Sequence, residues 1–85
     1  MAAGTIYQCA DECFNVLDKY LSQPDTHFRN LAEQLRARLA LWDKYSGARA
    51  IPGYRLDDRL QGLVPISSAI ISLLQVIASN IGACR

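Results

Sequence analysis

The feature that most constrains the fold of this chain is an uncharged stretch near its C-terminal end. Positions 63 to 84 read LVPISSAIISLLQVIASNIGAC and contain no Lys, Arg, Asp or Glu. The other 63 of the 85 residues carry all 17 of these charged side chains. Because a helix that is apolar almost all round is usually buried, we expect this stretch to form the central helix of a small bundle.

Two other interpretations of the stretch stay open. Its length is sufficient for a membrane span, which takes about 20 residues, although Pro65 and polar side chains dilute its apolar character. Alternatively, the helix packs in the monomer and also presents a polar stripe to another helix, since small polar side chains allow close approach. On a monomer the same stripe is a solvated face. Its members share one helix face at spacings of 4, 3 and 4: Ser68, Ser72, Gln75 and Ser79.

Three other segments have helical periodicity. Apolar side chains recur every three to four positions over residues 5–21 and 25–46, and LDDRLQGLV predicts a short helix over 56–62. With the uncharged helix over 65–82, the sequence predicts one all-α domain of residues 1–85, a compact antiparallel four-helix bundle with short loops. A six-helix arrangement like the death fold is the alternative, if one long segment breaks.

Capping residues predict where these helices begin and end. Thr5 and Gln8 match the capping-box pattern, in which each side chain bonds the other residue's backbone N–H. Asp25 or Thr26 is a good N-cap for the second helix, and Gly47 is a natural C-cap. The apolar stripes supply the expected core anchors: Phe28, Leu35, Leu39, Trp42, Leu60, Ile70, Leu73 and Ile77.

No set of side chains converges on a catalytic or metal site. His27 is the sole histidine, and Cys9 and Cys13 lie one helical turn apart. In an up-down bundle Cys84 approaches Cys9 while His27 lies at the opposite end, so a zinc site lacks a full set of ligands. Cysteine then serves as a small core residue. We expect no enzyme activity, no cofactor, no metal and no small-molecule substrate.

The segment RLDDR over 55–59 is the densest group of charges in the chain. Its two aspartates fall in the first turn of the short helix, where they favour the positive end of the helix dipole. With the flanking arginines they form local ion pairs or a charged face that docks a partner. The interaction hypothesis therefore joins part of this segment to the polar stripe: Arg55, Asp58, Arg59, Ser68, Ser72, Gln75 and Ser79.

Composition excludes several functional classes. The net charge is +1 and the basic residues form no block, so the footprint of a nucleic-acid binder is missing. The start MAAGTIYQCADEC lacks the basic and apolar regions of a signal peptide. Three cysteines are too few for a disulfide framework. We therefore expect a cytoplasmic protein.

Three stretches resemble a known family: LRARLALWDKYSGA, YRLDDRL and ISSAIISLLQVIASNI. Across roughly positions 9 to 80 the chain is similar to the N-terminal α-helical module of fungal vegetative-incompatibility and NLR-like (STAND) proteins, the HeLo, HeLo-like and SesA group. In that group a helix ends in an Arg–apolar–Leu-Trp run, followed by a Gly, a Leu-Asp-x-Arg-Leu segment and an apolar helix. The matching residues are Arg38, Leu41, Trp42, Gly47, Leu56, Asp57, Arg59, Leu60, Leu73 and Leu74.

The resemblance implies a regulatory or cell-death-effector domain that acts by homotypic assembly, sometimes at a membrane. The chain departs from full HeLo domains in being shorter and in having a weaker apolar block at its start. The expected function is a non-enzymatic interaction and self-association module, N-terminal in a longer protein of fungal immune or cell-death signalling. Its expected partner is itself or a related helical domain. The alternative is a membrane-active effector that inserts the apolar C-terminal helix.

Overall fold

The computed structural model describes the backbone of residues 5–83 and the side chains of residues 5–81. Four helices form in this part of the chain, which contains no strand, and the expected all-α class is confirmed. The helices are α1 (Ile6–Leu21), α2 (Thr26–Ser46), α3 (Leu56–Arg59) and α4 (Val64–Ala83). The three long helices begin and end within one residue of their predicted bounds, and α3 is a single turn.

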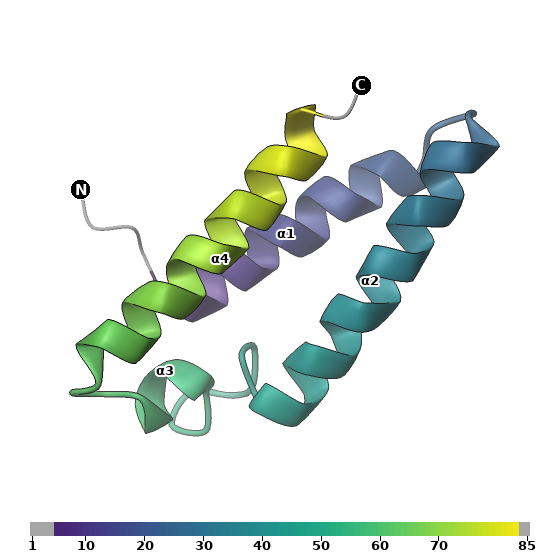
Figure 1. Cartoon of the computed structure of the whole chain (residues 1–85). Helices are drawn as coiled ribbons and strands as arrows, with labels where there is room; N and C mark the ends of the chain where they lie inside the picture. Colours follow the sequence, from purple (N-terminus) through teal and green to yellow (C-terminus); the bar gives the residue numbers. More distant parts are fainter. Residues whose placement is uncertain (1–4, 84–85) are drawn as a thin grey trace.

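The three long helices are arranged around α1. Helices α1 and α2 form a hairpin of opposite directions, and α4 returns in the direction of α1 along its other flank (Figure 1). Helix α1 packs against both α2 and α4, whereas α2 and α4 make few contacts with each other. Because α3 is too short to reverse the chain along the length of the molecule, α4 runs parallel to α1, so the antiparallel arrangement expected from the sequence holds for α1 and α2 but not for α1 and α4.

The predicted caps form as expected. The Thr5 hydroxyl accepts a hydrogen bond from the Gln8 backbone N–H at 3.1 Å, and the Gln8 side chain accepts one from the Thr5 N–H at 3.0 Å. The Asp25 carboxylate accepts from the backbone N–H groups of the first turn of α2. Helix α2 ends at Gly47, whose φ of 73° is the left-handed conformation that glycine adopts without strain.

The core is centred on α1, and the expectation of a central α4 is wrong. Among residues 5–81, six of the nine buried apolar residues lie on α1, and α4 contributes one. Three of the buried α1 side chains, Cys9, Ala10 and Cys13, are small. Helix α4 therefore approaches closely enough for the Cys13 thiol to donate a hydrogen bond to the Leu74 carbonyl at 3.2 Å. The buried residues are Ile6, Cys9, Ala10, Cys13, Phe14, Leu17, Ala32, Ala48 and Leu74.

The predicted core anchors are therefore corrected. Leu35, Leu73 and Ile77 are exposed, with 43%, 64% and 38% of their surface in contact with solvent. Each lies on the side of α2 or α4 that faces the other helix, but the two helices are held apart by α1 and leave that side open. The remaining five are half-buried against the edges of the core: Phe28, Leu39, Trp42, Leu60 and Ile70.

Charged side chains close the contact between α1 and α2. Arg49 binds Asp43 at 3.1 Å and Asp11 at 3.0 Å, and its guanidinium lies 3.8 Å from the centre of the buried Phe14 ring. Burial alone lowers the pKa of Arg49, but its hydrogen bonds to the two carboxylates more than offset this, so its pKa lies above the ordinary value. The charge of Arg49 therefore fixes the end of α2 against α1.

Candidate interaction site

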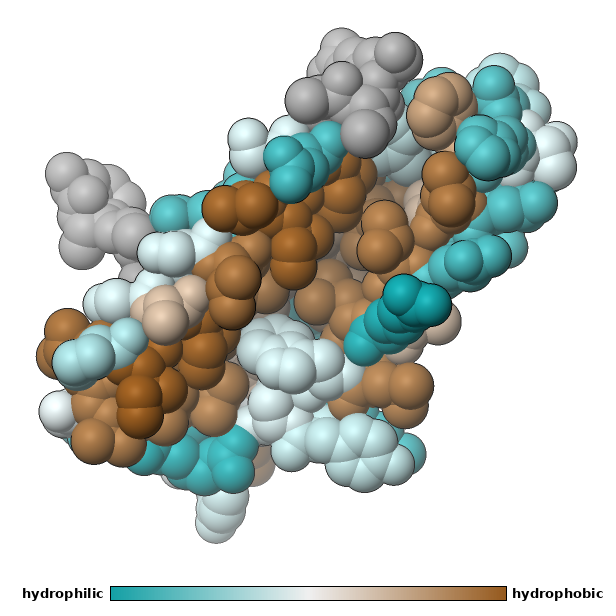
Figure 2. Space-filling model, viewed as in Figure 1, coloured by the Kyte–Doolittle hydropathy of each residue, from teal (hydrophilic) through white to brown (hydrophobic). Residues whose placement is uncertain are grey.

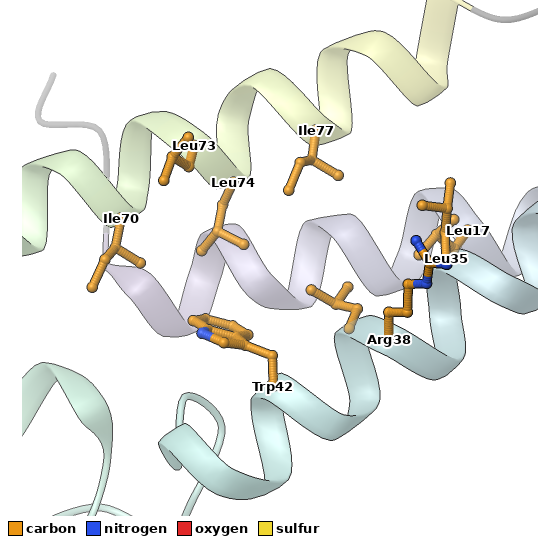
Figure 3. Close-up of a pocket in the computed structure, with 9 residues that line it drawn as sticks. Leu17, Leu35, Arg38, Trp42, Ile70, Leu73, Leu74 and Ile77 are labelled. Carbon is orange, nitrogen blue, oxygen red and sulfur yellow. The ribbon is translucent and has the colours of Figure 1, made fainter.

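An open apolar groove lies between α2 and α4, with α1 as its floor (Figure 3). It has a volume of about 340 Å³. Trp42 reaches into it from α2, opposite Ile70 and Leu74 of α4 (Figure 3). Among the described lining residues Arg38 alone is ionisable, and its side chain is exposed at the rim. The lining consists of Leu17, Leu35, Arg38, Leu39, Trp42, Ile70, Leu73, Leu74 and Ile77.

A second hollow of about 100 Å³ continues the first toward the far ends of the helices. The two share Leu17 and Leu35, and the second reaches Phe28 on α2 and Ile81 on α4. We call the two hollows together the α2–α4 groove. Figure 2 shows apolar side chains running along α4 and into this hollowed face beside α2. The groove is thus an elongated apolar trough rather than a closed chamber.

Helix α4 is the most exposed apolar element of the described chain. The window Val64–Ile81 is long and apolar enough to cross a membrane, and one of its 18 residues, Leu74, is fully buried. Soluble domains seldom leave a contiguous apolar face of this kind uncovered, and such faces mark sites of interaction. The uncharged, apolar composition of α4 was evident from the sequence, but the expectation that this helix lies in the interior was wrong.

The polar stripe of α4 is exposed, as expected for a solvated face. Ser68, Ser72, Gln75 and Ser79 all lie at the surface. Because each residue advances a helix by about 100°, this stripe occupies the flank of α4 opposite the groove. The stripe and the α2–α4 groove are therefore two separate surfaces, and a binding role for the stripe stays a prediction.

The predicted charged docking residues make contacts within the chain. Arg55 donates to the Ala50 carbonyl at 2.8 Å and stacks over the Tyr7 ring at 4.0 Å. Asp58 accepts from the backbone N–H of Gly53 at 2.8 Å and of Arg55 at 3.1 Å. Arg59 donates to a carbonyl at the end of α2. These side chains hold the 47–60 connection in place, so their charges are already engaged before any partner binds.

Asp57 has a structural role that sequence reasoning missed. Its carboxylate accepts from the backbone N–H of Ile6 at 2.8 Å and of Tyr7 at 3.0 Å, so it caps α1 from α3. Together with the Thr5–Gln8 box, this satisfies the N–H groups of the first turn of α1. No local signal reveals such a cap, because donor and acceptor lie about 50 positions apart.

The cysteines within the described residues belong to the core. Cys9 and Cys13 are buried, and burial raises the pKa of both thiols, so they stay protonated at neutral pH. A protonated thiol is a poor nucleophile and a poor metal ligand. Cys84, which sequence reasoning considered as a partner for Cys9, lies outside the described residues.

The arrangement offers shape and apolar surface rather than reactive groups. Over residues 5–81, no three His, Cys, Asp or Glu side chains come close enough together to hold a metal ion. The groove walls supply apolar side chains and one rim guanidinium, which suit a helix or another apolar occupant. Comparison with protein-family models, with curated proteins and with solved structures finds no match for this chain.

Proposed function

We propose that this chain is a non-enzymatic interaction module that self-associates through the apolar face formed by α2 and α4. The observation that carries the proposal is the exposure of α4, an uncharged helix in which Leu74 is the one fully buried residue over Val64–Ile81. Removing apolar surface from water stabilises an assembly by roughly 25 cal/mol per Å². Another helix laid against this face covers both α4 and the α2–α4 groove.

The compact four-helix bundle expected from the sequence fits this proposal as a property of the assembly. Within one chain α3 is a single turn and leaves one position of a bundle vacant beside α2 and α4. An additional helix from outside the chain fills that position. Domains are built from helices packed in layers around one core. Association supplies the helix that is missing beside α2 and α4.

The biological setting is proposed from the resemblance alone. The similarity of the Arg38–Trp42 run and the segment RLDDR to fungal NLR-like modules supports an N-terminal signalling domain of a cytoplasmic protein. Its partner is then a second copy or a related helical domain. Arg59 lies in that similar segment, and its guanidinium donates to the Ser46 carbonyl at the end of α2. This contact is consistent with a role for the similar segment in holding the fold together.

Self-association is tested by measuring the molar mass of the purified chain in solution across a range of concentrations. Light scattering or sedimentation equilibrium should give a mass that rises above the 9.4 kDa of one chain. A mass that stays at 9.4 kDa up to several hundred micromolar, a range that covers weak association with Kd near 10⁻⁴ M, would falsify the proposal.

A membrane-active role is the second candidate, and the exposure of α4 favours it over what the sequence alone indicated. A buried central helix needs unfolding before it can insert, whereas α4 already presents its apolar side to solvent. Leakage of a dye from liposomes tests this role. Val76→Arg is the diagnostic variant, because an arginine near the centre of an inserted helix opposes insertion by about 3 kcal/mol. Absence of leakage for the wild type excludes this candidate.

A further inference from the structure

Helix α4 carries two heptad seams, of which the monomer uses one. The inward seam packs toward α1 with spacings of 4, 3, 4 and 3, and Leu74 at its centre is buried. It consists of Ser67, Ile71, Leu74, Ala78 and Ile81. The outward seam has spacings of 3, 4, 3 and 4, the a and d pattern of a coiled coil. Every member is exposed: Ile66, Ala69, Leu73, Val76 and Asn80.

We propose that the outward seam is the twofold contact of a homodimer in which two copies of α4 pack antiparallel. This inference rests on the proposed function, since it specifies the partner and the register of the self-association. In this register Ile66 lies opposite Val76 of the second copy, and Ala69 lies opposite Leu73. Both pairs are centred on position 71, so one twofold axis generates all four contacts.

The sizes of the facing side chains favour the antiparallel pairing. Each Leu73 meets an Ala69, so a large side chain fills the space that a small one leaves, and Ile66 meets the similarly sized Val76. A parallel pair would instead place Ala69 against Ala69 and Leu73 against Leu73. That arrangement leaves a gap in the Ala69 layer. It would also pair Asn80 with Asn80 inside the seam, at a cost in stability, whereas the antiparallel register leaves Asn80 at its edge.

The absence of charge on α4 argues for a second copy as the occupant. A twofold axis brings identical surfaces together, so an ionisable side chain at a seam position near the axis, such as 69 or 73, would lie close to its own copy. Positions 63 to 84 contain none, although the rest of the chain has 17. Two copies therefore meet along α4 without like-charge repulsion, and neither needs a complementary charge from a different partner.

The groove enlarges the contact beyond the two α4 helices. Leu73 belongs both to the outward seam and to the groove wall, so the second α4 lies over the mouth of the α2–α4 groove. There it covers Leu35 of α2, which is 43% exposed.

A matched pair of charge variants on α4 tests the surface. Leu73→Glu puts a carboxylate at the centre of the outward seam, and Gln75→Glu puts the same charge on the polar stripe. Both positions are exposed in the monomer, so helix content by circular dichroism should match the wild type for each. We expect Leu73→Glu to raise the dimer Kd by at least about 100-fold, because a buried unpaired charge is strongly unfavourable. Gln75→Glu should change it by less than about threefold.

Disulfide trapping tests the orientation in a Cys84→Ser background, where the remaining thiols, Cys9 and Cys13, are buried. Ile66→Cys and Val76→Cys are prepared separately, one with a tag that makes the mixed product distinguishable. In the antiparallel register two copies of position 66 lie about 15 Å apart, beyond the roughly 7 Å that a disulfide spans between Cα atoms. We expect the mixture to cross-link and neither variant alone to do so.

Each outcome of these experiments has a defined meaning. Cross-linking of each variant with itself, but not in the mixture, overturns the antiparallel register. Dissociation by Gln75→Glu and not by Leu73→Glu places the contact on the polar stripe and overturns the seam, while self-association stands. Assemblies larger than two chains overturn the closed dimer. A wild type that stays monomeric overturns both this inference and the proposed function.

Discussion

Two adjacent leucines of α4 give the sharpest test of the fold. Leu74 is 4% exposed and packs on α1, whereas Leu73 is 64% exposed beside the groove. Both are replaced by alanine, so the same atoms are removed from neighbouring positions of one helix. Any difference in the free energy of unfolding then reports burial alone, because the change in helix propensity is the same for both.

The expected magnitudes follow from the exposed fractions. Leu74→Ala should lower the free energy of unfolding by about 2–5 kcal/mol, the range for a buried leucine. Complete burial of a leucine stabilises by about 1.5–3 kcal/mol. Leu73 has lost about a third of its exposure, so Leu73→Ala should lower the free energy by only about 0.5–1 kcal/mol. For a domain with a stability of about 5–15 kcal/mol, the first loss is large and the second is small.

Urea denaturation followed by circular dichroism measures the difference. With a slope near 1 kcal/mol per M for a chain of this size, the two midpoints should differ by at least about 1 M. The titration is run at about 1 µM protein, because a dimer that covers Leu73 would make its contribution depend on concentration. Equal losses would mean that both sides of α4 are buried, and a larger loss for Leu73→Ala would mean that its opposite side is the buried one. Either result would refute the α1-centred fold.

Three further predictions concern the caps, the turn and the thiols. Asp57→Ala should lower the free energy of unfolding by about 2 kcal/mol, because it strips two N–H groups at the start of α1 of their acceptor. Asp58→Ala removes a more exposed cap and should lower the free energy of unfolding by about 1 kcal/mol in the same urea titration. Equal losses for Asp57→Ala and Asp58→Ala would contradict the long-range cap. Gly47→Ala should destabilise the protein more than Gly53→Ala. Both glycines have positive φ, but a Cβ at Gly47 would lie 3.2 Å from the Tyr54 carbonyl oxygen, whereas a Cβ at Gly53 would meet nothing within 4 Å. Thermal denaturation measures the two losses, and the reverse order would be inconsistent with the turn. Because burial raises the pKa of Cys13, the folded chain keeps a proton that the unfolded chain loses above pH about 8.5, so stability should fall as pH rises beyond that value. Cys13→Ala should make this fall shallower, and an unchanged slope would argue against the buried thiol.

The local part of the fold was predictable because its causes are local. The Thr5–Gln8 box, the Asp25 cap and the Gly47 turn each depend on residues within four positions of one another. Apolar periodicity likewise placed the three long helices within one residue of where they form. Only α3 was predicted too long: it is a single turn, and its helix ends at Arg59.

The candidate site was predictable only as a set of apolar stripes. Periodicity showed that Leu35 and Leu39 share a face with Trp42, but not whether another helix covers that face. For α4 the ambiguity was greater, because a helix that is apolar nearly all round has no pattern that distinguishes an inward from an outward seam. Leu73 and Leu74 are equivalent in sequence and opposite in burial.

The sequence by itself determined the helices, their caps and the concentration of apolar, uncharged surface on one of them, because these depend on side chains that are near neighbours along the chain. Tertiary structure alone decided that α1 is the centre, that Asp57 caps it from about 50 positions away, and that α4 stays open to solvent. The physical reason is the close approach of α2 and α4 to α1. Small side chains on the first half of α1 admit a helix on each flank, and once both flanks are occupied no further long helix within residues 5–83 is left to cover α4.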